Sequence, residues 1–95
     1  MDKQLAVLLI EDDTIACQEF EQYIDQCDDI RLSAVTNNSQ EALDLTKYHL
    51  PDAVILDLEL HHGGGNGLLY LKELPKLNLT HIPYILIHNH LLNPD

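Results

Sequence analysis

The stretch Ala53-Val54-Ile55-Leu56-Asp57 decides how this chain is expected to fold, because it is a short apolar run that ends in a carboxylate. A second apolar run, Leu5–Ile10, ends in three acids, Glu11-Asp12-Asp13. A helix-like stretch separates the two runs, which predicts parallel strands whose carboxyl ends meet at one edge of a sheet. Ligands of open parallel sheets bind just outside that edge. Acids clustered there indicate a site for a cation.

One small domain with an aliphatic core is what the length and composition allow. The chain has 95 residues, of which 45% are hydrophobic and none is Trp, so the core is expected to consist of Leu, Ile and Val. The net charge of -11, from 16 acidic against 5 basic residues, argues against binding to nucleic acid or to an anionic membrane. Acids at strand ends would instead hold a hard divalent cation, Mg²⁺ or Mn²⁺.

The cysteines favour a cytoplasmic location. Cys17 and Cys27 fall in one predicted helix, where their positions are roughly 15 Å apart, and a disulfide needs α-carbons within about 7 Å of each other. The sequence has no signal peptide and no apolar run long enough to span a membrane. A reducing compartment is therefore expected.

Strands and helices are expected to alternate along the chain. Strands are predicted at Leu5–Ile10, at 30–35 near a sheet edge, at Ala53–Asp57 and at 84–87. The first helix is predicted from Asp13 onward, with Asp13 or Thr14 as its cap. A second is predicted at 40–49, with Asn38 and Glu41 in a capping arrangement, and a third at 68–74, up to Pro75. The stripe Ala16, Phe20, Tyr23 and Ile24 is expected to pack in the core. Such alternation predicts a parallel sheet.

Three motifs together resemble the receiver domain of two-component response regulators: Ile10-Glu11-Asp12-Asp13, Ile55-Leu56-Asp57-Leu58-Glu59-Leu60, and a glycine loop that ends in Gly67-Leu68-Leu69. The resemblance covers residues 5–87. It implies an α/β, flavodoxin-like, doubly wound parallel sheet, here with about four strands and three helices in the order 2-1-3-4. It also implies phosphorelay signal transduction with a sensor histidine kinase as partner, and no enzyme activity of the chain's own.

The resemblance implies a role for each acid. Asp57 matches the phosphoacceptor, whose carboxylate takes a phosphoryl group from a phosphohistidine and becomes an aspartyl phosphate. Asp12 matches the direct ligand of Mg²⁺ (or Mn²⁺), and Glu11 matches its partner, which often acts through water. Glu59 matches the position that offers its backbone carbonyl, and Asp57 is the remaining ligand. Asp13 is interpreted as a helix cap.

The sequence departs from the family pattern after its fourth predicted strand. His88 stands at the switch position, where the family has a Ser or Thr whose hydroxyl binds the phosphoryl group. The family's Lys on a fifth strand has no counterpart, so residues 1–95 are interpreted as a single receiver domain truncated after the fourth strand, without the last strand and the last two helices. The fourth strand would then be an exposed apolar edge, through which self-association is expected.

Two other functions remain open. A pseudo-receiver, an interaction module that self-associates without phosphorylation, is favoured by His88 and by the missing Lys. A hydrolase with an aspartyl nucleophile would need a second Asp two residues after Asp57, where Glu59 stands.

Two further motifs have simpler interpretations. The histidines His61, His62, His88 and His90 have no Cys partner and lack the spacing of a zinc site, so they are interpreted as solvated. The glycines Gly63, Gly64, Gly65 and Gly67 lack the Gly-Lys-Ser/Thr of a phosphate-binding loop and are interpreted as a flexible loop.

Overall fold

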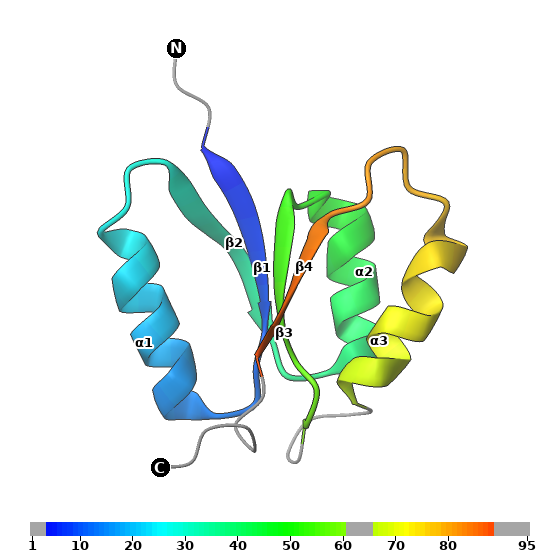
Figure 1. Cartoon of the computed structure of the whole chain (residues 1–95), viewed down its shortest axis with the longest axis horizontal. Helices are drawn as coiled ribbons and strands as arrows, with labels where there is room; N and C mark the ends of the chain where they lie inside the picture. The colour runs from blue at the N-terminus through cyan, green and yellow to red at the C-terminus, as the bar shows by residue number, and fades with distance from the viewer. Residues whose placement is uncertain (1–3, 61–65, 89–95) are drawn as a thin grey trace.

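The structure, a computed structural model, describes residues 4–60 and 66–88 and arranges them in three layers (Figure 1). Its four strands are parallel and lie in the order β2-β1-β3-β4. Along the chain they are β1 (Leu5–Ile10), β2 (Ile30–Thr36), β3 (Ala53–Asp57) and β4 (Tyr84–His88). Helix α1 (Thr14–Asp25) lies on one face of the sheet, and α2 (Ser39–His49) and α3 (Gly67–Glu73) lie on the other. The predicted fold class and strand order are confirmed.

Each helix begins after a short polar side chain that accepts a backbone N–H from the first turn. Asp13 accepts one from α1 at 3.2 Å, and Asn38 accepts that of Glu41 in α2 at 2.8 Å. Asn66 does the same for α3 at 2.9 Å. The structure therefore confirms the predicted caps at Asp13 and Asn38, and it adds Asn66.

The end of the third helix differs from the prediction. The α-helix ends at Glu73, and a 3₁₀ turn, η1 (Leu74–Leu77), follows it directly. The sequence predicted that Pro75 would stop the chain from continuing as a helix. Pro75 instead lies in the first turn of η1, where no N–H donor is required, and the turn ends at Asn78 with a left-handed backbone conformation.

The main core lies between the sheet and the pair α2 and α3. Its members from the sheet are Leu8, Ile10, Val54 and Leu56, and its members from the helices and the adjoining segments are Ala42, Leu43, Leu60, Tyr70 and Leu74. Tyr70 is fully buried, and its hydroxyl lies 2.8 Å from Oγ1 of Thr46. Because the Thr46 hydroxyl already donates to the carbonyl of Ala42, Tyr70 is the donor. Burial raises the pKa of Tyr70, which keeps it neutral in this role.

Helix α1 packs less tightly than its sequence predicted. Ala16 and Ile24 are buried and Phe20 is half-buried, but Tyr23 is 70% exposed. The prediction for Tyr23 was wrong because the buried side chains follow a narrow stripe with a spacing of four, and Tyr23 lies to one side of it. Both cysteines are free thiols. Among the described residues, no helix has the length and apolar character needed to cross a membrane.

Candidate functional site

The carboxyl ends of β1, β3 and β4 place three polar side chains at one level of the sheet. Glu11 directly follows Ile10, which is in register with Leu56, and the next residue of β3, Asp57, is in register with His88. Successive side chains of a strand point to opposite faces. Since Leu56 belongs to the core beneath α2 and α3, Asp57 and His88 point to the face on which α1 lies.

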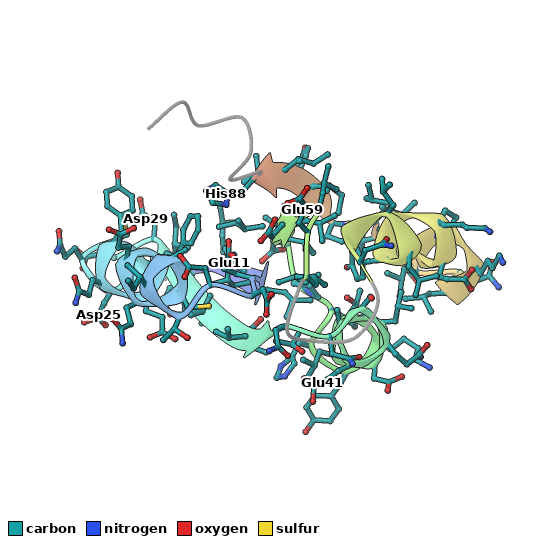
Figure 2. The ribbon with its side chains drawn as sticks, turned by 90° about the horizontal axis from the view of Figure 1, so that it is seen from below. Glu11, Asp25, Asp29, Glu41, Glu59 and His88 are labelled. Atoms are coloured by element: carbon teal, nitrogen blue, oxygen red, sulfur yellow. The ribbon has the colours of Figure 1, made fainter. Side chains whose placement is uncertain are left out.

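Glu11 has a fully buried carboxylate with a hydrogen-bond partner on each oxygen. Oε2 accepts the backbone N–H groups of Asp12 and Asp13 at 3.0 and 3.1 Å. Oε1 lies 3.2 Å from Nδ1 of His88. Figure 2 looks onto the carboxyl ends of the strands and shows these two side chains approaching each other. When the Glu11 carboxylate is ionised it only accepts hydrogen bonds, and Nδ1 of His88 is then the donor.

Asp57 is the last residue of β3 and is only 1% exposed. Its Oδ1 accepts the backbone N–H of Glu59 at 3.0 Å, which turns the chain sharply after the strand. The N–H of Gly67, the first residue of α3, donates to the carbonyl of Leu58 at 3.1 Å. The segment that carries Asp57 is therefore fixed by its own side chain and by the start of α3.

Gly67 allows α3 to begin directly against the end of β3. A Cβ atom at this position would lie 2.6 Å from the carbonyl oxygen of Asp57 and 2.7 Å from Cα of Leu58. Both contacts are with backbone atoms, which cannot move aside independently. The sequence pointed to Gly67 only as the end of a glycine loop, and the structure shows that its missing Cβ leaves room for the backbone of Asp57 and Leu58.

Asp12 and Glu41 extend the acidic edge toward β2. Glu11, Asp12 and Glu41 line one open hollow together with Thr36 at the end of β2. The hydroxyl of Thr36 donates to Oε1 of Glu41. This role of Glu41 is not visible in the sequence, because an acid in the first turn of a helix has the same pattern whether it supports the helix or lines a site.

The acids leave a clear electrostatic effect on Cys17. Its thiol donates to the backbone carbonyl of Glu11 at 3.6 Å. The pKa of Cys17 is raised to about 11, first by burial and then by the negative charges of Glu11, Glu21, Asp13 and Asp12. The thiol is therefore protonated at neutral pH.

The donor chemistry of this edge fits a hard divalent cation, because Glu11, Asp12 and Asp57 all offer carboxylate oxygens. The carboxylate oxygens of these three residues do not converge on a single position in the structure. Among residues 4–60 and 66–88, no three His, Cys, Asp or Glu side chains form a group that could hold a metal ion. Glu59, the predicted carbonyl ligand, lies next to Asp57, and its N–H donates to Oδ1 of that residue.

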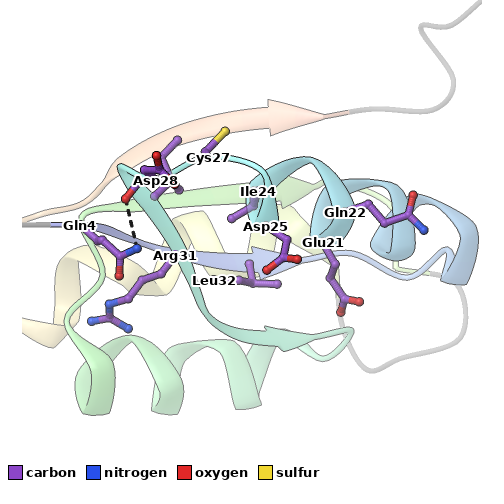
Figure 3. A pocket seen from close by; sticks show the side chains of 10 residues that line it. Gln4, Glu21, Gln22, Ile24, Asp25, Cys27, Asp28, Arg31 and Leu32 are labelled. Carbon is purple, nitrogen blue, oxygen red and sulfur yellow. Dashed lines mark hydrogen bonds between the residues drawn. The ribbon is translucent and has the colours of Figure 1, made fainter.

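Other residues considered from the sequence fall elsewhere. His61, His62, His90 and the glycines at 63–65 lie outside the described residues. A separate open hollow lies between the end of α1 and the start of β2 (Figure 3). Asp25, Asp28 and Arg31 line it, and the side-chain amide of Gln4 donates to the carbonyl of Asp28 at 3.2 Å. None of the predicted site residues lines this hollow.

The chain belongs to the response regulator receiver domain family, which it matches over residues 7–93. It is 38% identical over 72 residues to the probable C4-dicarboxylate response regulator DctR of Priestia megaterium, a match that covers 76% of this chain and 31% of that protein. It is 33% identical, also over 72 residues, to the transcriptional regulatory protein MalR of Bacillus subtilis (strain 168), covering 76% of this chain and 30% of MalR. The chain thus spans less than a third of either relative.

Solved structures show the same fold. The response regulator domain of Thermotoga maritima CheB aligns with a TM-score of 0.80 at 20% identity, covering 97% of this chain and 65% of that one. A DNA-binding response regulator of the LuxR family from Staphylococcus aureus aligns with a TM-score of 0.79 at 29% identity, covering 95% of this chain and 72% of that one.

Proposed function

We propose that this receiver domain accepts a phosphoryl group on Asp57 from a sensor histidine kinase. The observation that carries the proposal is the position of Asp57, at the carboxyl end of a central parallel strand and level with Glu11. An oxygen of the Asp57 carboxylate would attack the phosphorus of a phosphohistidine. The new O–P bond forms as the N–P bond breaks, and the electron pair of that bond returns to the imidazole of the donor, which takes up a proton.

The neighbouring residues support this chemistry by position and charge. Glu11, Asp12 and Asp57, with the backbone carbonyl of Glu59, would hold a Mg²⁺ or Mn²⁺ ion. When bound, this ion offsets the negative charge of the carboxylates and of the transferring phosphoryl group. The N–H of Glu59 donates to Oδ1 of Asp57 and so fixes the rotation of the carboxylate.

The test uses acetyl phosphate as a small donor in the presence of Mg²⁺, with intact-mass spectrometry as the measurement. A phosphate adduct is expected on the wild type and is expected to disappear in Asp57→Asn. The control is Asp25→Asn, the same substitution at an exposed acid of α1, and this variant should keep the adduct. A phosphate adduct that persists in Asp57→Asn would contradict the proposal.

A second candidate function is self-association through β4, with or without phosphorylation. Within the described residues β4 is an edge of the sheet, and it exposes Tyr84, Leu86 and Ile87 by 82%, 57% and 55%. Residues 82–87 contain no charged side chain, in a chain of net charge -11. A second copy is the favoured occupant, because two such neutral strands can pair antiparallel about a two-fold axis while the acidic surfaces stay apart.

Sedimentation velocity at micromolar concentration tests this second function. The wild type is expected to sediment as a dimer or larger species, and Tyr84→Lys is expected to sediment as a monomer because it places a charge in each of the two paired edges, which are otherwise neutral. Tyr48→Lys is the matched control, since Tyr48 is 83% exposed and lies on α2. A wild type that sediments only as a monomer argues against self-association.

The remaining parts of the proposal concern where the protein acts. The net charge of -11 disfavours direct contact with nucleic acid or with an anionic membrane surface. Free thiols at Cys17 and Cys27 are compatible with a reducing cytoplasm. We infer that the chain receives its signal by contact with a kinase in that compartment.

A further inference from the structure

The contact between Glu11 and His88 reaches across the strand that carries Asp57. Glu11 follows β1 and His88 ends β4, and in the sheet β3 lies between these two strands. The 3.2 Å distance from Oε1 to Nδ1 therefore joins two side chains over the end of β3. Asp57, the residue at that end, is in register with His88 and has an exposed fraction of 1%.

The imidazole of His88 is held from a second direction by α1. The ring of Phe20 meets it edge to face, with 5.4 Å between the ring centroids and 87° between the planes. Aromatic pairs favour this geometry. The side chain of His88 remains 37% exposed, so it lies at the outer boundary of the site while the carboxylate of Glu11 is fully buried.

The same contact engages the oxygen that Glu11 would offer to a cation. Oε2 already accepts two backbone N–H groups, from Asp12 and Asp13. The other oxygen, Oε1, is the one that contacts Nδ1 of His88. A small hydroxyl side chain at position 88 would be too short to reach Oε1 across β3.

We propose that His88 is an autoinhibitory residue, which closes the site by bonding to Glu11 over Asp57 and so competes with the divalent cation and shields the phosphoacceptor. This inference rests on the proposed function of Asp57. Removal of the imidazole takes this hydrogen bond away from Oε1 of Glu11 and uncovers the end of β3 at Asp57. We expect the affinity for a divalent cation to rise roughly ten-fold, the factor that corresponds to one competing hydrogen bond to a charged group.

The test measures binding of Mn²⁺ alone, by the loss of the electron paramagnetic resonance signal of the free ion during titration. His88→Ser is expected to bind Mn²⁺ roughly ten-fold more tightly than the wild type. His81→Ser is the matched control, because His81 is exposed and lies outside this site, and it should bind as the wild type does. Phe20→Leu keeps His88 but removes its ring partner, and it should shift the affinity in the same direction by a smaller factor.

Three results would overturn the inference. Equal affinity in His88→Ser and the wild type would show that the contact does not compete with the ion. Weaker binding in His88→Ser would show that the imidazole is a ligand of the ion. Undetectable binding in His88→Ser would show that opening the site does not create a cation site.

The experiments distinguish a failure of the closure, meaning autoinhibition of the site by His88, from a failure of the proposed phosphoacceptor role of Asp57. If His88→Ser binds Mn²⁺ more tightly but neither it nor the wild type forms a phosphate adduct on Asp57, the closure stands and the phosphoacceptor role fails. If the wild type forms the adduct and His88→Ser binds Mn²⁺ no more tightly, Asp57 keeps its role and the closure fails.

Discussion

Replacement of Gly67 by alanine tests whether the close approach of α3 to β3 supports the site. The backbone of Gly67 is outside the left-handed region, so alanine can adopt its conformation. Helix propensity alone would favour alanine by about 0.5–1 kcal/mol. Against this, the added Cβ would lie 2.6 Å from the carbonyl oxygen of Asp57 and 2.7 Å from Cα of Leu58. Forcing atoms into a packed interior costs about 1–3 kcal/mol.

The steric repulsion of the added Cβ should outweigh the gain in helix propensity, because both obstructing atoms belong to the backbone of the segment that carries Asp57. We expect Gly67→Ala to lose on the order of 1 kcal/mol in the free energy of unfolding. For a domain of this size this loss lowers the melting temperature by roughly 4–8 °C. The displacement also moves Asp57, so the yield of the phosphate adduct should fall under conditions where the wild type is labelled.

Urea unfolding followed by circular dichroism measures the change in stability. Leu68→Ala is the matched control, since it places alanine in the same helical turn at a residue that is 62% exposed, and its effect should stay within about 0.5 kcal/mol. A Gly67→Ala variant as stable as the wild type, or more stable, would refute the reasoning, because helix propensity would then outweigh the steric repulsion in the change of unfolding free energy.

Three further changes have defined outcomes. Tyr70→Phe removes the buried donor to Thr46 and should cost about 1 kcal/mol of unfolding free energy in urea titrations. Asn38→Ala removes the cap of α2 and should also cost about 1 kcal/mol, with helix loss visible by circular dichroism. Cys17, with its pKa raised from 9.0 to about 11, should be alkylated by iodoacetamide about 100-fold more slowly at pH 8 than a free cysteine, as measured in Cys27→Ser. Because the folded state favours the protonated thiol, its contribution to stability is present below pH 9 and is lost as the pH rises toward 11.

The sequence predicted the sheet well because each strand is a short apolar run with turn or capping residues beside it. The run Ala53–Asp57 predicts a strand buried on both faces, and a parallel sheet then brings its carboxyl end to the same edge as that of Leu5–Ile10. Asp13 and Asn38 were identifiable as caps because capping depends on local spacing. The acids of the site could be placed at one edge for the same reason.

The contacts inside the site could not be predicted from the sequence. Glu11 and His88 are 77 positions apart, and their contact depends on strand order, register and side-chain length together. The half-buried position of Phe20 beside His88 depends on how α1 lies against the sheet, which its periodicity does not specify. Tyr23 was misplaced for the same reason. The space that Gly67 leaves for Asp57 is likewise a property of two packed elements.

His88 links the two surfaces for which functions are proposed. It ends the edge strand β4, and its side chain closes the site at Glu11. A second copy paired along β4 would order the backbone of that strand up to His88 and so favour the closed arrangement. A divalent cation would favour the open arrangement, because it needs the oxygen of Glu11 that His88 engages. Two ligands that favour different states of one element weaken each other's binding by the same factor. Self-association and cation binding are therefore expected to oppose each other, because both act on the contact between His88 and Glu11.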